Sequence, residues 1–227
     1  MLDGEEIHVW LIPLPVDSEY PSRLAQVLSI EESKRAARFI FERDRARFIV
    51  AHVALREILA PYTCEEAQAL RFTIAEKGKP HLTDHPQIRF NLSHSGSFAM
   101  LAIAREREVG VDIERINPER TTIAIAERFF APAEVRELMA LPEERRVTGF
   151  FACWSRKEAY IKARGEGLGI PLDSFQVSLG EKAELRQAED RDRWSMCALE
   201  APKGYAAALV AEGSIRQVTQ LTWTQEA

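Results

Sequence analysis

Two acidic residues in the middle of the chain have the spacing expected of cation ligands on a strand. Residues 109–114 read Val-Gly-Val-Asp-Ile-Glu, an alternation that predicts a β-strand. Successive side chains of a strand point to opposite faces, so Asp112 and Glu114 share one face and Val111 and Ile113 share the other, buried face. Neighbouring carboxylates repel each other, so either exposure at a strand end or a bound cation is expected. Mg²⁺ is typically held by one or two carboxylates together with substrate phosphates, which suits this pair.

A second set of reactive side chains lies on a predicted helix. Trp154, Glu158 and Lys162 follow one another at intervals of four residues, which places them on one helical face. The order Glu158 then Lys162 also suits an ordinary helical ion pair, so a structural role stays open. Glycines at 165, 167 and 169 follow. They either allow a ligand to approach the backbone or form a helix cap and a turn.

Anion-binding chemistry is indicated in two other segments. Ser93, His94 and Ser95, expected in a turn after a strand, offer several hydrogen-bond donors, although a histidine in a turn is more often structural. A strongly basic run contains seven lysines and arginines: Lys34, Arg35, Arg38, Arg43, Arg45, Arg47 and Arg56. This run fits either a solvated helical face or a binding site for a polyanionic ligand.

The elements that must position these residues are a mixture of helices and strands, which predicts an α+β fold. Ser29 is expected to cap a helical segment starting near Ile30, and the apolar helical stretch that follows is expected to end at Pro61. The remaining helices are predicted at 122–129, 133–141 and 143–164. The strands are predicted at 7–14, 70–75, 89–92, 98–104 and 109–114, with further short strands after residue 174.

Composition narrows the class of protein. The chain has 227 residues and a formal net charge of −5, which argues against a dedicated nucleic-acid binder. The three cysteines, Cys64, Cys153 and Cys197, lie far apart, as expected of reduced thiols in a cytoplasm. The acidic N-terminus lacks the order of a signal peptide, and no apolar run is long enough to cross a bilayer. We therefore expect a cytoplasmic protein that binds neither nucleic acid nor membrane.

Taken together and in this order, the segments resemble the phosphopantetheinyl transferases, specifically the monomeric type that activates surfactin synthetase. The resemblance runs from about residue 39 to residue 177, and Phe129, Phe130 and Glu134 also fit it. The stretches that carry it are 78–80, 90–95, 109–114 and 154–162, with Gly165, Gly167 and Leu168.

The resemblance implies a fold, a reaction and partners. The fold would be two similar α/β halves, 1–105 and 106–227, related by a pseudo-two-fold axis, with coenzyme A bound between them. The reaction would transfer the 4′-phosphopantetheine arm of coenzyme A to a serine of an apo acyl or peptidyl carrier protein, releasing 3′,5′-ADP. It would need Mg²⁺, with Mn²⁺ as a possible substitute, and the enzyme would be a monomer. Carriers of nonribosomal peptide, polyketide and fatty-acid synthesis all remain open as substrates.

The resemblance also implies roles for individual residues. Asp112, Glu114 and Glu158 would hold the metal, Lys162 would stabilise the leaving group, and Glu158 would be a third ligand or the general base. The catalytic residues would thus be Glu158, Lys162 and Asp112, with the Asp112 side chain facing the cation and not the core. The residues in contact with coenzyme A would be Arg47, Lys79, Pro80, Ser93, His94 and Lys162. Some relatives have a polar residue after the basic position at Arg47, where this chain has Phe48.

Two alternatives have different consequences. A metal-dependent phosphodiesterase or nuclease would use the same acids for hydrolysis without a carrier protein. A non-catalytic module would bind acidic partners through residues 34–56 and need no magnesium. If the chain is a transferase, residues 116–130 are the expected carrier-docking surface, because they follow the strand of Asp112 and Glu114 and are partly apolar.

Overall fold

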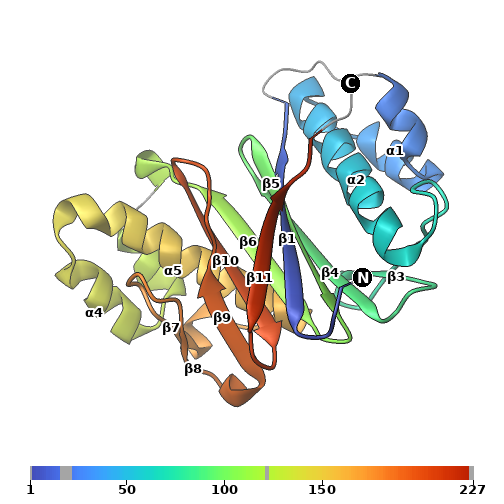
Figure 1. Cartoon of the computed structure of the whole chain (residues 1–227). Coiled ribbons are helices and arrows are strands. Elements are labelled where there is room, and N and C mark those ends of the chain that lie inside the picture. The colour runs from blue at the N-terminus through green and yellow to red at the C-terminus, as the bar shows by residue number, and fades with distance from the viewer. Residues whose placement is uncertain (1, 16–21, 121–122, 225–227) are drawn as a thin grey trace.

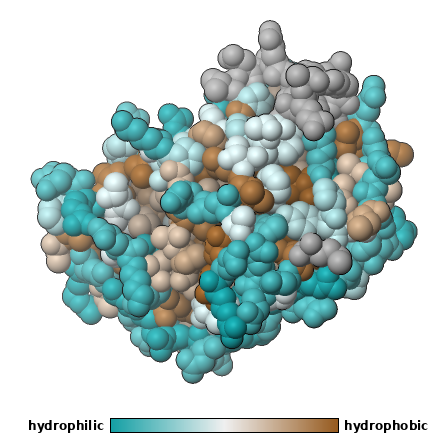
Figure 2. Space-filling model, in the orientation of Figure 1, coloured by the Kyte–Doolittle hydropathy of each residue, from teal (hydrophilic) through white to brown (hydrophobic). Residues whose placement is uncertain are grey.

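Two β-sheets face each other at the centre of the molecule, and one long helix covers the outer face of each (Figure 1). This structure is a computed structural model that describes residues 2–15, 22–120 and 123–224. Apolar side chains of both sheets, including Ile7, Met100, Val111 and Leu209, form the core between them. In the view of Figure 2, hydrophobic surface gathers mostly toward the middle, and hydrophilic residues predominate at the margins.

The first sheet and its helices come mainly from the N-terminal part of the chain. The strand order is β11-β1-β5-β4, and a two-stranded ribbon, β2-β3, lies beside it. The elements are β1 (Glu6–Pro13), α1 (Ile30–Ala36), α2 (Glu42–Thr63), β2 (Phe72–Ile74), β3 (Pro80–Leu82), β4 (Ile88–Ser95), β5 (Phe98–Arg105) and β11 (Gln217–Thr222), with a 3₁₀ helix at Ser22–Val27.

The second sheet has the order β6-β10-β9 and carries its own ribbon, β7-β8. The elements are β6 (Val109–Arg115), α3 (Ile123–Phe129), α4 (Pro132–Ala140), α5 (Glu143–Arg164), β7 (Gln176–Val177), β8 (Leu185–Gln187), β9 (Trp194–Ala198) and β10 (Tyr205–Glu212). Short 3₁₀ helices lie at Pro118–Arg120, Gly167–Gly169, Leu172–Ser174 and Arg191–Arg193.

The two halves repeat one topology, which confirms the predicted α+β fold of two similar halves. In each half the first strand pairs antiparallel with the last strand, as β1 does with β5 and β6 with β10. Each half also contains one helix of 22 residues, α2 or α5. The final strand, β11, belongs to the C-terminal part of the chain but returns to the first sheet, where it pairs parallel with β1.

Local sequence explains the start of α1 and the end of α5, but not the end of α2. Ser29 caps α1 as predicted, in a capping box with Glu32. Helix α5 spans the predicted residues and ends at Gly165, whose φ of +68° suits a glycine C-cap. The predicted end of α2 at Pro61 is wrong, because α2 continues to Thr63. The Thr63 hydroxyl bonds the carbonyls of Leu59 and Ala60, which stabilises this last turn.

Within the described residues, no helix combines the length and apolar character needed to cross a bilayer.

Candidate active site

A single glycine allows helix α5 to lie directly on strand β6. A Cβ atom at Gly110 would stand 2.2 Å from the carbonyl oxygen of Ala159 and 2.3 Å from the amide nitrogen of Ala163. Both atoms belong to the backbone of α5 and cannot move aside as a side chain could, so only glycine fits at this position. Gly110 shares its face of β6 with Asp112 and Glu114. The close approach therefore brings the neighbours of Ala159 and Ala163 on α5 next to the two acids.

Asp112 lies at the centre of the resulting cluster and is only 1% exposed. Its Oδ1 atom accepts hydrogen bonds from Lys162 Nζ at 2.5 Å and from the Ser93 hydroxyl at 2.9 Å. Its Oδ2 atom is buried and has no hydrogen-bond partner among the described residues. The expectation that Asp112 faces away from the core is wrong, because α5 covers this face of β6. Val111 and Ile113 are fully buried on the opposite face, as predicted.

Glu114 and Glu158 complete the acidic cluster, and both are half-buried. Burial raises the pKa of Glu158 to about 7; the nearby charge of Lys162 opposes this rise, and those of Asp112 and Glu114 add to it. Burial and the charge of Asp112 also raise the pKa of Glu114. The structure thus brings the three predicted metal ligands and Lys162 into one electrostatic cluster. Among the described residues, however, no group of three or more acidic, histidine or cysteine side chains is arranged so that it could hold a metal ion.

His94 lies beside this cluster, on β4. The segment 93–95 belongs to the strand, where Ser95 pairs with Phe98, so its predicted turn conformation is wrong. The tight turn comes one residue later, at Gly96 with φ +57°. His94 keeps part of its surface exposed, yet desolvation lowers its pKa; a backbone hydrogen bond opposes the shift, and the positive charges of Lys162, His52 and Arg35 add to it.

Basic groups from both halves of the molecule therefore surround His94. Arg35 belongs to the basic run noted in the sequence, whereas His52 was not predicted. The His52 ring lies against the Phe48 ring with a centroid distance of 4.0 Å, and the Arg35 guanidinium lies over the same Phe48 ring, 5.3 Å from its centroid. The spacing of four residues between Phe48 and His52 on α2 is the sequence pattern that could have revealed this pair. The cluster of Arg35, His52, His94 and Lys162 is suited to a polyanion.

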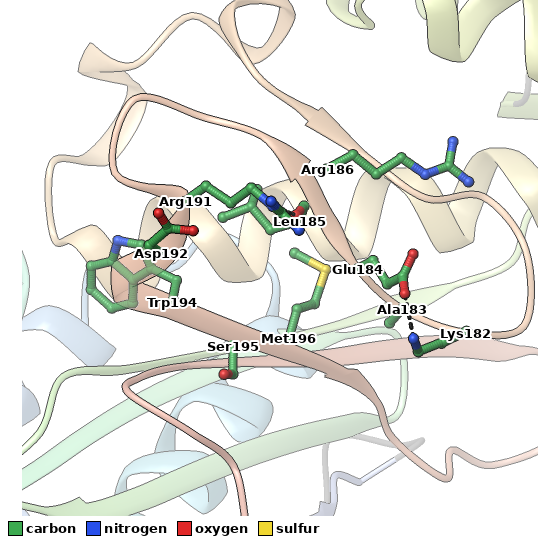
Figure 3. A pocket seen from close by; sticks show the side chains of 10 residues that line it. All are labelled: Lys182, Ala183, Glu184, Leu185, Arg186, Arg191, Asp192, Trp194, Ser195 and Met196. Atoms are coloured by element: carbon green, nitrogen blue, oxygen red, sulfur yellow. Dashed lines mark hydrogen bonds and ion pairs between the residues drawn. The ribbon is translucent and has the colours of Figure 1, made fainter.

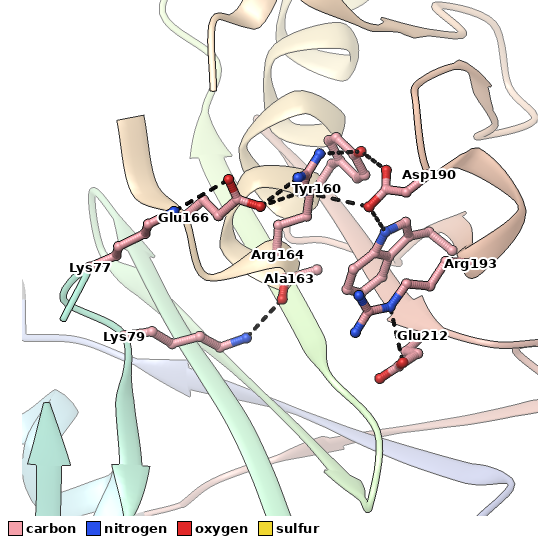
Figure 4. Close-up of polar contacts among 10 residues, drawn as sticks. Lys77, Lys79, Tyr160, Ala163, Arg164, Glu166, Asp190, Arg193 and Glu212 are labelled. Atoms are coloured by element: carbon pink, nitrogen blue, oxygen red, sulfur yellow. Dashed lines mark hydrogen bonds and ion pairs between the residues drawn. The ribbon is translucent and has the colours of Figure 1, made fainter. Parts of the chain in front are cut away.

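Three other predicted contacts of coenzyme A lie in different surroundings. The Lys79 ammonium is bound by Glu108 at 2.7 Å and by the carbonyl of Val109 at 3.0 Å. It also donates to the carbonyl of Ala163 at 3.1 Å (Figure 4). Lys79 thereby ties the loop before β3 to the last turn of α5. Pro80 is the first residue of β3. Arg47 donates from Nε to the carbonyl of Pro15 at 3.2 Å.

Further polar contacts fix the C-terminal end of α5 from both sides (Figure 4). On one side, Lys77 lies 3.5 Å from Glu166. On the other, the Tyr160 hydroxyl donates to Asp190, which also accepts from the Trp194 indole at 2.7 Å. The end of α5 is therefore anchored to both halves, which keeps Lys162 in place.

A surface pocket elsewhere contains none of the predicted site residues. Its volume is about 420 Å³, and residues in and around β8 and β9 line it (Figure 3). Most of its charged groups are already engaged: Lys182 pairs with Glu184 at 2.5 Å, and Arg191 donates to the carbonyl of Leu185 at 2.9 Å. The predicted site residues thus lie together around Asp112 and His94, away from this pocket.

The expected docking segment, 116–130, combines some core packing with a larger share of exposed surface. Ile123 is 42% exposed, whereas Phe130 is 2% exposed and packs in the core of the second half. Residues 121–122 of this segment and the side chain of Arg120 lie outside the described residues.

Comparisons with known proteins cover nearly the whole chain. The family described as the 4′-phosphopantetheinyl transferase superfamily matches residues 108–210, and the family described as 4′-phosphopantetheinyl transferase, N-terminal, matches residues 14–106. The chain is 36% identical to the 4′-phosphopantetheinyl transferase HetI of Nostoc sp., over 92% of this chain and 89% of the relative. It is 32% identical to the 4′-phosphopantetheinyl transferase Sfp of Bacillus subtilis, over 87% of this chain and 88% of the relative.

Proposed function

We propose, from the premise that the chain belongs to the 4′-phosphopantetheinyl transferase superfamily, that the Asp112 cluster is the place where it acts on coenzyme A. The chain is a 4′-phosphopantetheinyl transferase, which transfers the phosphopantetheine arm of coenzyme A to a serine of an apo carrier protein.

Mg²⁺, or Mn²⁺ in its place, is the proposed metal, with Asp112, Glu114 and Glu158 as its ligands. The observation that carries this proposal is the buried Oδ2 atom of Asp112, which has no hydrogen-bond partner among the described residues. A buried carboxylate oxygen without a partner is costly, and a cation would satisfy it. A cation would also relieve the repulsion that contributes to the raised pKa values of Glu114 and Glu158. When bound, the metal would neutralise charge on the pyrophosphate of coenzyme A.

Two residues of α5 are proposed to act on the reacting groups. Lys162 holds its ammonium beside Asp112 and Ser93, at 2.5 Å and 2.9 Å. Its positive charge would stabilise the negative charge on the leaving 3′,5′-ADP. Glu158, with its pKa raised to about 7, would accept the proton of the carrier serine, since a general base is most effective when its pKa is near the working pH.

The basic cluster around His94 is the proposed site for the 3′-phosphate of coenzyme A. Arg35 and His52 support this proposal, because both add positive charge near His94 from the helices of the first half of the molecule. The resemblance alone supports the other proposed contacts with coenzyme A, which are Arg47, Lys79, Pro80 and Ser93. For Lys79, a contact with the nucleotide would have to compete with three bonds that it already makes inside the protein.

We also propose that the enzyme works as a monomer in the cytoplasm. The three cysteines, Cys64, Cys153 and Cys197, are free thiols, which supports a reducing compartment. A hydrolase built on the same acids would cleave coenzyme A without any carrier, and a non-catalytic module would modify nothing.

Intact-mass analysis of apo-carrier proteins incubated with the enzyme, coenzyme A and Mg²⁺ separates these possibilities. We expect the carrier to gain the phosphopantetheine arm, and Asp112→Ala to abolish this gain. Asp84→Ala is a matched control, because Asp84 forms an exposed ion pair with Arg71. Asp112 is buried, so thermal unfolding of the variant must accompany the assay. Turnover of a folded Asp112→Ala variant near the wild-type rate, at physiological Mg²⁺, would remove Asp112 from the metal site.

A further inference from the structure

The two halves meet where edge strand β4 of the first sheet lies beside edge strand β6 of the second. Side chains of β4 accept hydrogen bonds from backbone amides of β6. Asn91 accepts from the amide of Val111 at 2.8 Å, and Ser95 accepts from that of Arg115 at 3.0 Å. Between them, Ser93 accepts from the amide of Ile113 at 3.5 Å. Alternate side chains of β4 thus take the place of a neighbouring strand along β6.

Both serines use the same hydroxyl for a second bond. Ser93 donates to Asp112 Oδ1 at 2.9 Å, and Ser95 donates to Glu114 Oε2 at 2.8 Å. A hydroxyl has one proton and two lone pairs. A backbone amide can only donate, so one lone pair of each serine hydroxyl accepts from an amide of β6. The single proton of that hydroxyl is then donated to the carboxylate. Each serine therefore connects the backbone of β6 to the acid one residue earlier on the same strand.

These bonds decide which carboxylate oxygens remain for a ligand. On Asp112, Oδ1 accepts hydrogen bonds from both Ser93 and Lys162, and Oδ2 has no partner among the described residues. On Glu114, Oε2 accepts a hydrogen bond from the Ser95 hydroxyl. A carboxylate held by one oxygen cannot rotate freely, so its other oxygen keeps its direction. In known metal sites, residues that orient the ligands in this way are nearly as important for affinity as the ligands.

We infer that Ser93 and Ser95, on the first half of the molecule, are positioning residues that orient the carboxylates of Asp112 and Glu114, on the second half, toward the metal. The inference rests on the proposed metal site, and it goes further by making that site dependent on the junction of the two halves. It assigns the hydroxyl of Ser93 to the protein's own carboxylate, where the resemblance suggested a contact with coenzyme A.

Ser95 offers the cleaner test, because Ser93 also contacts Lys162. Ser95→Thr keeps the hydroxyl, and Ser95→Val has nearly the same shape without it. Both are β-branched and suit a strand, so the pair isolates the hydroxyl from folding. Ser97→Ala is the control, because the Ser97 hydroxyl makes no hydrogen bond within the part of the chain that the structure describes.

The experiment measures Mn²⁺ affinity by electron paramagnetic resonance, with coenzyme A present and no carrier protein, so that no turnover is needed. We expect Ser95→Val to weaken Mn²⁺ binding by about 10–100-fold, the range for loss of a residue that orients metal ligands. Ser95→Thr should retain most of the affinity, and Ser97→Ala should bind as the wild type does. Thermal unfolding of each variant checks that the folded proteins are compared.

The outcomes separate this inference from the proposed metal site. Wild-type binding that is lost in Asp112→Asn but unchanged in Ser95→Val would overturn the inference and leave the metal site standing. Equal weakening in Ser95→Thr and Ser95→Val would also overturn it, because the hydroxyl would then not be the cause. Failure of the wild type to bind Mn²⁺ would overturn both.

Discussion

Helix α5 carries two lysines, five residues apart, that bind carboxylates in different ways. Lys157 is fully buried, and its ammonium is bound by Glu134 at 2.8 Å and by the carbonyls of Leu172 at 2.7 Å and Phe175 at 2.8 Å. Glu134 also accepts from the backbone amides of Ala131 at 2.8 Å and Val177 at 2.7 Å. Every proton of the ammonium and both oxygens of Glu134 have partners.

Lys162 and Asp112 form the contrasting pair. Lys162 donates to Asp112 and Ser93, yet Asp112 Oδ2 has no partner among the described residues, and the nearby Glu158 has a raised pKa. A satisfied buried network makes the fold rigid, whereas an unsatisfied one is costly until a ligand completes it. Lys157 therefore holds the helix in place, whereas the cluster around Lys162 is incomplete, which supports the proposal that substrate and metal bind there.

The largest effect should come from breaking the incomplete cluster at Glu158. Glu158→Gln keeps the shape and one oxygen but cannot accept a proton. We expect a loss in turnover on the order of 10²–10⁴-fold, as is typical when a general base is removed. Raised Mg²⁺ should restore only a small part of the rate, because we expect the base role to exceed the ligand role. The measurement is the carrier-modification rate across Mg²⁺ concentration.

The pH dependence of activity gives a second test of the role of Glu158. Glu158 must be ionised to act as a base, so wild-type activity should fall as pH decreases through its pKa, which is raised to about 7 without metal. A bound cation favours the ionised form and moves this fall below pH 7. The Glu158→Gln variant should lose this acidic limb, provided that chemistry limits turnover. Full rescue by Mg²⁺ with an unchanged profile would show that Glu158 is mainly a ligand.

Disrupting the Lys157–Glu134 pair should lower the stability of the fold and leave catalytic turnover unchanged. Lys157→Met leaves the Glu134 carboxylate buried without its counter-charge, and we expect the free energy of unfolding to fall by about 3–5 kcal/mol. Urea unfolding measures this loss, with the exposed Lys34 as the control in Lys34→Met. Turnover per folded molecule should stay near that of the wild type. A large fall in the turnover of folded protein would contradict the structural role assigned to Lys157.

The smallest effect is expected in the basic cluster around His94. His94→Ala should weaken coenzyme A binding about tenfold, equivalent to about 1.4 kcal/mol. Arg35, His52 and Lys162 would still attract the phosphate. Separate titrations of coenzyme A and carrier protein measure the effect, and carrier affinity should not change. His81→Ala, on β3, is the matched control. Unchanged coenzyme A affinity in His94→Ala would exclude this histidine from the phosphate site.

Some features could be predicted because they depend on neighbours in the sequence. The alternation in β6 predicted the shared face of Asp112 and Glu114, and the end of α5 at Gly165 followed from helix capping. The segment 93–95 was misassigned as a turn, because serine and glycine near a histidine usually mark a loop. Its strand conformation depends on pairing with β5, which local composition does not reveal.

The amino-acid sequence is enough to identify the chemical groups, the faces on which the acids and the α5 residues lie, and the resemblance to the transferase family. Which of these groups meet depends on the tertiary structure. Lys162 reaches Asp112 across 50 residues, and Ser93 reaches Asp112 across 19. The contact of Lys162 requires the close approach of α5 to β6 at Gly110. The contact of Ser93 requires the junction of β4 with β6. Periodicity specifies the face on which a side chain lies but not the partner across it, because that partner depends on packing between distant elements.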